Sequence, residues 1–156
     1  MTIGIDRVHA ATPDLEDFLA AHLLDMESTA PPESRHAFDM TRLLAPDVRL
    51  FAAKGRDDEL VGTGALAALE PGHEEVKSMR TAPWMRGRGI GSAILAALLA
   101  DARARGIRRL SLETGASDYF WTAHRLYAKA GFDECEPFGA YEEDPHSLFL
   151  TKRLTE

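Results

Sequence analysis

The segment Arg86-Gly87-Arg88-Gly89-Ile90-Gly91 combines the residue types that hold phosphate groups. Glycines let a backbone approach a ligand closely and adopt positive φ angles. An amphipathic helix is expected directly after the segment, and the first N–H groups of a helix are unpaired and partly positive. Arg86 and Arg88 add two full charges. The segment is therefore a candidate pyrophosphate site, with a tight turn that needs no ligand as the alternative.

The distribution of charge fits an anion site in this part of the chain. The protein carries a net charge of −7, which argues against a general nucleic-acid binder because such proteins need a basic face. Between Val76 and Arg109, however, eight basic residues accompany a single acid, Asp101. The middle of the chain is thus suited to a small polyanion, while ordinary solvated helix and loop ends remain the alternative.

Two other nucleotide sites are tested by spacing. A P-loop needs Gly-Lys followed by Ser or Thr, and no such sequence follows the segment. A dinucleotide fingerprint needs a third glycine, where Gly87-x-Gly89-x-x-Ser92 ends in serine. Glu113, at the end of the next expected strand, keeps a dinucleotide site open as a less favoured alternative.

Two motifs resemble those of the GNAT N-acetyltransferases. Arg86-x-x-Gly89-x-Gly91 is similar to the family's acetyl-CoA signature, and Ala123-x-x-Leu126-Tyr127-x-Lys129-x-Gly131-Phe132 is similar to its second conserved block. One helix and one strand separate the two motifs, as in the family. The resemblance is specific from about Glu75 to Phe132, and further segments resemble a subgroup of small bacterial members.

The resemblance implies acetyl-CoA as co-substrate. The glycine loop would bind the pyrophosphate, and pantetheine would lie between two splayed strands, 75–81 and 107–113. A backbone N–H near the end of the first strand would polarise the thioester carbonyl. Phe120 stands where many members carry a cofactor-binding asparagine, so that contact is either absent or supplied elsewhere, with Thr114 and Ser117 as the candidates. The implied cofactor-binding residues are Met79, Arg80, Thr81, Arg86, Gly87, Arg88, Gly89, Ile90, Gly91, Ser92, Thr114 and Lys129.

The resemblance also implies two catalytic residues. Tyr127 lies where many members carry a tyrosine that protonates the departing sulfur, and a phenol is protonated at neutral pH. Its alternative is a packed core tyrosine. Glu75 lies where some members carry a glutamate that deprotonates the amine through water; its alternatives are a solvated strand-end acid and a base supplied by His73.

The acceptor amine is expected near loops, where functional residues concentrate. His22, His36 and Tyr141 are the candidate substrate residues. The six histidines form no H-x-H or H-x-x-x-H pair, so no metal site is expected. Trp84 and Trp121 are interpreted as packing residues. The acidic flanks weakly favour a cationic acceptor, a small molecule or a peptide.

Hydrophobic periodicity gives the elements that must position these groups. Strands are expected at 3–9, 48–53, 60–69, 75–81, 107–113, 132–138 and 147–154. Helices are expected from Pro13, around Leu43, from Ile90 to Ala102 and over 118–130. Gly62 and Gly64 indicate a bulge or a close backbone approach. The fold class is α/β with a mixed sheet, the GNAT acyl-CoA N-acyltransferase fold, with splayed parallel strands and helices on both faces.

Length and composition agree with one globular domain over 1–156, since 45% of the residues are hydrophobic and 28% are charged. The single cysteine, Cys135, excludes an internal disulfide and fits the cytosol. No membrane span or secretory signal is expected. The leading function is an acetyl-CoA-dependent N-acetyltransferase. A non-catalytic acyl-CoA-binding regulator of the same fold is the second hypothesis, and a homodimer is open because related proteins often dimerise.

Overall fold

The computed structural model describes residues 2–27, 31 and 38–154. In chain order its elements are β1 (Gly4–Val8), α1 (Pro13–Glu27), α2 (Met40–Leu43), β2 (Val48–Lys54), η2 (Arg56–Asp58), β3 (Leu60–Glu70), β4 (His73–Thr81), η3 (Pro83–Met85), α3 (Ile90–Ala104), β5 (Arg109–Gly115), η4 (Asp118–Phe120), α4 (Trp121–Lys129), β6 (Asp133–Glu134) and β7 (Ser147–Arg153).

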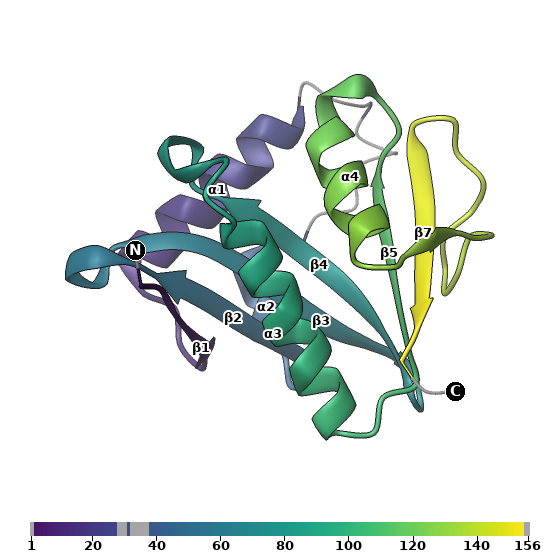
Figure 1. The fold of residues 1–156 in the computed structure, drawn as a ribbon, viewed down its shortest axis with the longest axis horizontal. Coiled ribbons are helices and arrows are strands. Elements are labelled where there is room, and N and C mark those ends of the chain that lie inside the picture. The colour runs from purple at the N-terminus through teal and green to yellow at the C-terminus, as the bar shows by residue number, and fades with distance from the viewer. Residues whose placement is uncertain (1, 28–30, 32–37, 155–156) are drawn as a thin grey trace.

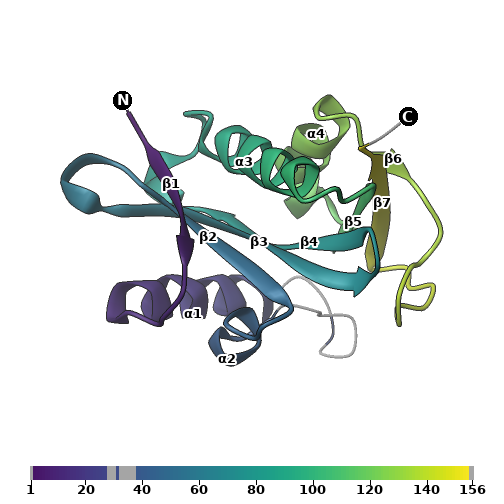
Figure 2. The same ribbon diagram turned by 90° about the horizontal axis from the view of Figure 1, so that it is seen from below.

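A seven-stranded sheet in the order β1-β2-β3-β4-β5-β7-β6 forms the centre of the molecule. Neighbouring strands run antiparallel except β4 and β5, which are parallel. Helices α1 and α2 cover one face of the sheet and α3 and α4 the other, as Figure 2 shows. The mixed sheet with helices on both faces confirms the predicted fold class.

Helix α3 packs unusually close to the sheet because β3 presents glycines beneath it. A Cβ atom at Gly62 would lie 2.5 Å from the Cδ1 atom of Ile94, and one at Gly64 would lie 2.6 Å from its Cγ2 atom. The predicted close backbone approach is thus confirmed. The apolar stripe of α3, buried against the sheet, consists of Ile90, Ile94, Leu95, Leu98, Leu99 and Ala102.

Strands β4 and β5 pair over only three positions, ending at Glu75 opposite Ser111. Beyond that point they diverge, so the predicted splayed pair is confirmed and a gap opens toward the first turn of α3 (Figure 1). At the closed end of the gap, a residue that follows α3 is hydrogen-bonded to β4. The Arg105 guanidinium donates two hydrogen bonds, of 2.9 and 2.7 Å, to the Glu74 carboxylate.

Two predicted elements differ from the structure. The strand expected over 132–138 is reduced to Asp133–Glu134. Phe132 turns inward against the ring of Tyr127, and Pro137 has no N–H to continue a ladder. The helix expected from Asp118 begins with a 3-10 turn, η4, and becomes α-helical only at Trp121.

Candidate active site

The glycine loop forms the N-terminus of α3 at the open end of the gap. Gly87 and Gly89 have φ angles of 78° and 79°, where residues with a side chain are strained. Gly89 is the N-cap of α3 and contributes no side-chain hydrogen bond to it. The intrahelical ladder begins with the Ala93 N–H donating to the Gly89 carbonyl at 3.0 Å. The N–H groups of the first turn are therefore available to an anion.

The side chains of the glycine loop are exposed, except that of Ile90. Arg86 and Arg88 reach solvent beside the α3 N-terminus. Ile90 is buried in the core, so only its backbone N–H could contact a ligand. Gly91 lies beside the end of β4, since the Thr81 hydroxyl is 3.7 Å from where its Cβ would be. The loop and the last residue of β4 are thus brought together, as the cofactor hypothesis requires.

A β-bulge interrupts β4 inside the gap. The register with β3 passes from Thr63 opposite Arg80 to Ala65 opposite Lys77, so β4 contains one extra residue. Ser78, in the bulge, has a φ of 54°, a left-handed conformation that is strained for serine. Its hydroxyl oxygen is buried and has no hydrogen-bond partner in the described chain. An unpaired buried donor and a disrupted ladder beside the gap fit a ligand that carries hydrogen-bond acceptors.

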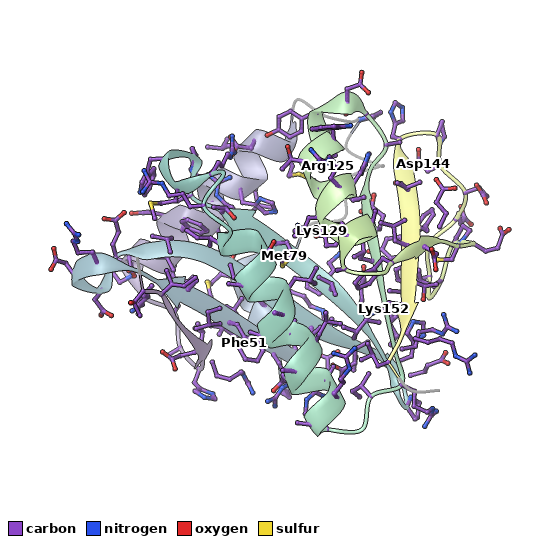
Figure 3. The ribbon with its side chains drawn as sticks, in the orientation of Figure 1. Phe51, Met79, Arg125, Lys129, Asp144 and Lys152 are labelled. Atoms are coloured by element: carbon purple, nitrogen blue, oxygen red, sulfur yellow. The ribbon has the colours of Figure 1, made fainter. Side chains whose placement is uncertain are left out.

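The bulge sends the side chains of the next residues to opposite faces. Met79 lies on the α3 face, with its sulfur 2.9 Å from where a Gly64 Cβ would be; Figure 3 shows it between α3 and the sheet. Arg80 lies on the α1 face, where its guanidinium is ion-paired with Asp25 at 2.5 Å and lies over the Phe18 ring. The Arg80 side chain is thus held by residues of α1, and only the Arg80 backbone is able to contact a ligand in the gap.

The remaining cofactor candidates lie on β5 and α4. Thr114 is buried near the end of β5. Lys129 is exposed on the last turn of α4, and Figure 3 shows it projecting from that helix with Arg125. The ring of Phe120 lies directly over Gly115, because a Cβ atom at that glycine would overlap the Cε2 atom of the ring. An apolar ring therefore occupies the place of the asparagine expected from the family pattern.

Tyr127 is buried on α4, and its ring packs edge-to-face on that of Phe132 at 5.8 Å. Burial raises the pKa of the phenol above its ordinary value, so the group stays protonated across the physiological range. A buried, protonated phenol is able to donate a proton or a hydrogen bond. The same packing would also suit a structural tyrosine, so its role remains a proposal.

Glu75 lies on the opposite face of the sheet, in a buried polar cluster. The Tyr141 hydroxyl donates a 2.5 Å hydrogen bond to Glu75 Oε2 and accepts one of 3.1 Å from the Lys77 ammonium. Lys77 Nζ is also 3.6 Å from Glu75 Oε2 and 4.3 Å from the Phe38 ring centroid. The interpretation of Glu75 as a solvated strand-end acid is wrong, because its exposed fraction is 4%.

Burial and neighbouring charges shift the pKa values of two members of this cluster, Tyr141 and Lys77. Burial and then the Glu75 charge raise the pKa of the Tyr141 phenol, which makes Tyr141 a permanent donor to the carboxylate. Burial lowers the pKa of Lys77, while Glu75 and Glu113 oppose that shift. Ser147 donates a 2.7 Å hydrogen bond to Glu113, at the neighbouring part of β5. Tyr141, predicted to line the acceptor site, is thus placed against the candidate base.

The two candidate histidines have different outcomes. His22 lies on α1 beside Arg80 and Asp25; burial, followed by the Arg80 charge, lowers its pKa to about 4. It is neutral at physiological pH and belongs to the surroundings of the Arg80–Asp25 pair. His36 lies outside the described residues. His73, the reserve base, packs against Phe138 with the two rings tilted and their centroids 6.1 Å apart, and its Nε2 atom is 2.7 Å from Ser111 Oγ.

Sequence reasoning missed several polar residues of the site. Lys77 and Ser78 lie on β4, yet neither is next to a recognisable motif. Glu113 was considered only for a dinucleotide. The signal that could have identified Lys77 is the alternation of the polar residues His73, Glu75 and Lys77 along one face of β4. The tryptophan interpretation is wrong: Trp84 and Trp121 are 62% and 57% exposed.

No group of three or more His, Cys, Asp or Glu side chains in residues 2–27, 31 and 38–154 is arranged to hold a metal ion. Within the same ranges, none of the helices is long and apolar enough to cross a membrane.

Comparison with known proteins agrees with this geometry. Residues 15–132 match the model of the acetyltransferase (GNAT) family. The chain is 44% identical over 144 residues to the uncharacterized N-acetyltransferase YedL of Escherichia coli, covering 92% of this chain and 90% of that one. It is 44% identical over 125 residues to an IAA acetyltransferase of Azospirillum brasilense, covering 80% of each.

Among solved structures, one named as an acyl-CoA N-acyltransferase from Klebsiella pneumoniae superposes with a TM-score of 0.78 at 30% identity over 97% of both chains. The family obtains its acetyl group from acetyl-CoA, the ligand that the α3 N-terminus and the β4–β5 gap fit, and the dinucleotide alternative loses its support. The chain belongs to the GNAT family and is an acetyl-CoA-dependent N-acetyltransferase.

Proposed function

We propose that the protein acetylates a primary amine of a small molecule or peptide by direct attack of the amine on acetyl-CoA, within one catalytic domain spanning 1–156. The observation that carries this proposal is the divergence of β4 and β5 directly after Glu75. The gap connects the face that bears the glycine loop with the face that bears the Glu75 cluster. Two reactants can therefore meet there from opposite sides.

On the α3 side, the Arg86–Gly91 loop binds the pyrophosphate through the N–H groups of the first turn of α3. The bulge in β4 supplies hydrogen-bond donors to the thioester carbonyl, and the Ser78 hydroxyl is the side-chain donor among them. Support comes from its buried oxygen, which has no partner within the described residues. Each donor aimed at a developing oxyanion is typically worth about 3 kcal/mol.

On the other side, Glu75 accepts the proton that the ammonium of the acceptor must lose before it can attack. The Tyr141 and Lys77 hydrogen bonds hold the carboxylate in place. Tyr127 gives its proton to the departing sulfur, since burial keeps the phenol protonated. Acetyl-CoA supplies the activated acyl group, and these four side chains only transfer protons or hold the reacting groups in position.

The acceptor is proposed to be a primary amine. A cytosolic location is proposed with it, on the grounds that the single cysteine fits a reducing compartment. Because the Azospirillum brasilense relative is named an IAA acetyltransferase, IAA is tested as a separate compound beside the amines.

The test is CoA release from acetyl-CoA across a panel of amines, with wild type, Glu75→Gln and Glu75→Asp compared. The Gln variant keeps the shape of the side chain and loses the base, so turnover should fall by about 10²–10⁴-fold while CoA affinity is unchanged. The Asp variant should recover part of the rate. Wild-type turnover in Glu75→Gln would exclude Glu75 as the base. CoA binding with no turnover on any amine would favour the regulator.

A further inference from the structure

Three basic side chains form a single row across β4, β5 and β7 at the closed end of the gap. His73 is paired with Arg109, and Arg109 is paired with Arg153. Directly paired residues project from the same face of a sheet. The row therefore lies on the face of Glu75, two residues earlier along β4 and opposite to the face of α3. We call these three residues the basic row.

The basic row is electrostatically unfavourable as it stands. Like charges directly opposite one another destabilise a sheet, and Arg109 and Arg153 are such a pair. Among the described residues, neither guanidinium lies within ion-pair distance of a carboxylate. Arg109 donates one hydrogen bond of 2.9 Å, to the Thr151 hydroxyl. Four other arginines of the described chain do have acidic partners, namely Arg42, Arg49, Arg80 and Arg105.

A hollow of about 190 Å³ lies over the row, lined also by Glu70, Pro71, Gly72 and Arg108. The Arg108 guanidinium lies over Gly72, where a Cβ atom would come within 2.7 Å of its Cζ atom. A third guanidinium is thus admitted because the turn carries a glycine, while burial lowers the pKa of His73 and makes its ring a neutral member of the row. The hollow is open to solvent and has room for more than one water-sized group, so a small anion can enter it with part of its hydration shell.

We propose that the basic row and Arg108 bind a small oxyanion, a phosphate or a carboxylate group. Several cations that converge on one hollow gain charge-assisted hydrogen bonds from such a group, and the anion removes the Arg109–Arg153 repulsion. The site is separate from the glycine loop, which lies at the open end of the gap (Figure 1). It is adjacent to the chemistry, because His73 Nε2 lies 2.7 Å from the Oγ atom of Ser111, the partner of Glu75.

The oxyanion has two possible sources. It is either free in solution or part of the acceptor, whose amine would then lie at Glu75. At about 3.4 Å per residue, His73 and Glu75 are about 7 Å apart along β4, a span that a small amino acid derivative can cover. The second source rests on the proposed function, whereas the first does not.

Thermal unfolding of CoA-saturated protein tests the site without any acceptor. Inorganic phosphate is titrated against chloride at constant ionic strength, for wild type, Arg153→Gln and Arg153→Glu. Arg56→Gln is the matched control, since it removes one exposed arginine at the distant η2 turn. Saturating CoA keeps phosphate out of the glycine loop.

Wild type and Arg56→Gln should show the same saturable rise in Tm with phosphate. Arg153→Gln should need about tenfold more phosphate, because one charged hydrogen-bond donor is lost. In chloride it should be at least as stable as wild type, since the like-charge pair is gone, and Arg153→Glu should be more stable still. Equal phosphate responses in wild type and Arg153→Gln would overturn the proposal. A loss of stability in chloride with no change in the phosphate response would make Arg153 purely structural.

Steady-state kinetics then distinguish the two sources. If the acceptor's own carboxylate or phosphate binds the basic row, inorganic phosphate is a competitive inhibitor against that acceptor. The same acceptor with its acid group converted to a neutral amide then has a higher KM. Arg153→Gln removes this preference without lowering kcat on the amide. For a free anion, phosphate leaves the acceptor KM unchanged while the Tm response persists. Failure of acetylation with an intact Tm response would refute the proposed function and leave the anion site standing.

Discussion

Replacement of Gly89 by aspartate is the sharpest test of the cofactor loop, because the same helix contains a matched control. Gly89 precedes α3 with a φ of 79°, and a Cβ there would meet nothing within 4 Å. Gly106, just beyond the other end of α3, has a φ of 78° and equally open surroundings. Either substitution adds one charge and about 1–2 kcal/mol of left-handed strain without a clash. The two sites lie about 25 Å apart along the helix.

The expected loss of affinity follows from the position of the new carboxylate. A pyrophosphate held by the first turn of α3 would lie about 5 Å from the carboxylate that Gly89→Asp introduces. At an effective dielectric constant of about 20, two unit charges at that distance repel by about 3 kcal/mol. This corresponds to an increase in Kd of about 100-fold, which salt screening reduces toward tenfold. Backbone strain is present in both the free and the bound protein and cancels from the binding energy.

Calorimetric titration with CoA at two ionic strengths measures the effect, with thermal unfolding to report the strain. Gly89→Asp should bind CoA at least tenfold more weakly than Gly106→Asp, and the difference should shrink at high salt. Gly89→Ala and Gly106→Ala carry the strain without the charge and should bind like wild type. If Gly89→Asp and Gly106→Asp have the same Kd, the glycine loop does not hold the pyrophosphate and the placement of the cofactor is wrong.

Substitutions at four further side chains test their individual roles. Tyr127→Phe should lower kcat and kcat/KM together by up to about 10²–10⁴-fold, with CoA affinity unchanged; a wild-type rate with chemistry limiting would make Tyr127 a packing residue. Ser78→Ala should lower turnover about tenfold or more without loss of Tm. Ser78→Gly should raise Tm, because glycine relieves the backbone strain, while its turnover stays low. Full activity in Ser78→Ala would exclude the Ser78 hydroxyl as a donor to the thioester carbonyl. Lys77→Met should lower the free energy of unfolding by about 3 kcal/mol in denaturant titration, because it leaves the buried Glu75 carboxylate without its ion-pair partner. Adding Glu75→Gln to this variant should restore most of that free energy. If the effects of the two substitutions are simply additive, the pairing is wrong. Burial in the folded protein lowers the pKa of His22 from 6.5 to about 4. The free energy of unfolding should therefore decline by up to about 3 kcal/mol as the pH drops from 6.5 toward 4, because the unfolded chain binds the proton more readily. His22→Asn should show less of this decline.

The sequence was most informative where a feature is local. The glycine loop, the stripe of α3 and the β2–β3 hairpin each depend on residues within one turn or one strand, so their types and spacing suffice. Gly62 and Gly64 indicated a close approach, although not that Ile94 makes it. The boundaries of β6 and α4 were less accurate, because inward packing of Phe132 ends the pairing of β6 and a 3-10 turn precedes α4.

Features that depend on strand pairing could not be read from the sequence. The Glu75–Tyr141 hydrogen bond joins residues 66 positions apart, and the basic row requires the register of β4, β5 and β7. Ser78 carries a left-handed backbone without being a glycine, so the bulge has no signature in the residue types. These contacts arise only when the sheet is assembled, and they form most of the acceptor side.

The alternation of side chains along β4 explains why one strand can serve both reactants. Glu74 projects toward α3 and is held by Arg105, while its neighbour Glu75 projects toward Tyr141. Because β5 separates from β4 directly after Glu75, backbone groups of the bulge remain accessible from both faces. A transfer through this gap needs no covalent carrier on the protein. The one thiol, Cys135, is a poor candidate carrier in any case, since burial raises its pKa and it lies beyond β6. We therefore propose direct attack of the amine on the thioester, with the proton leaving on the Glu75 face and the thiol on the Tyr127 face.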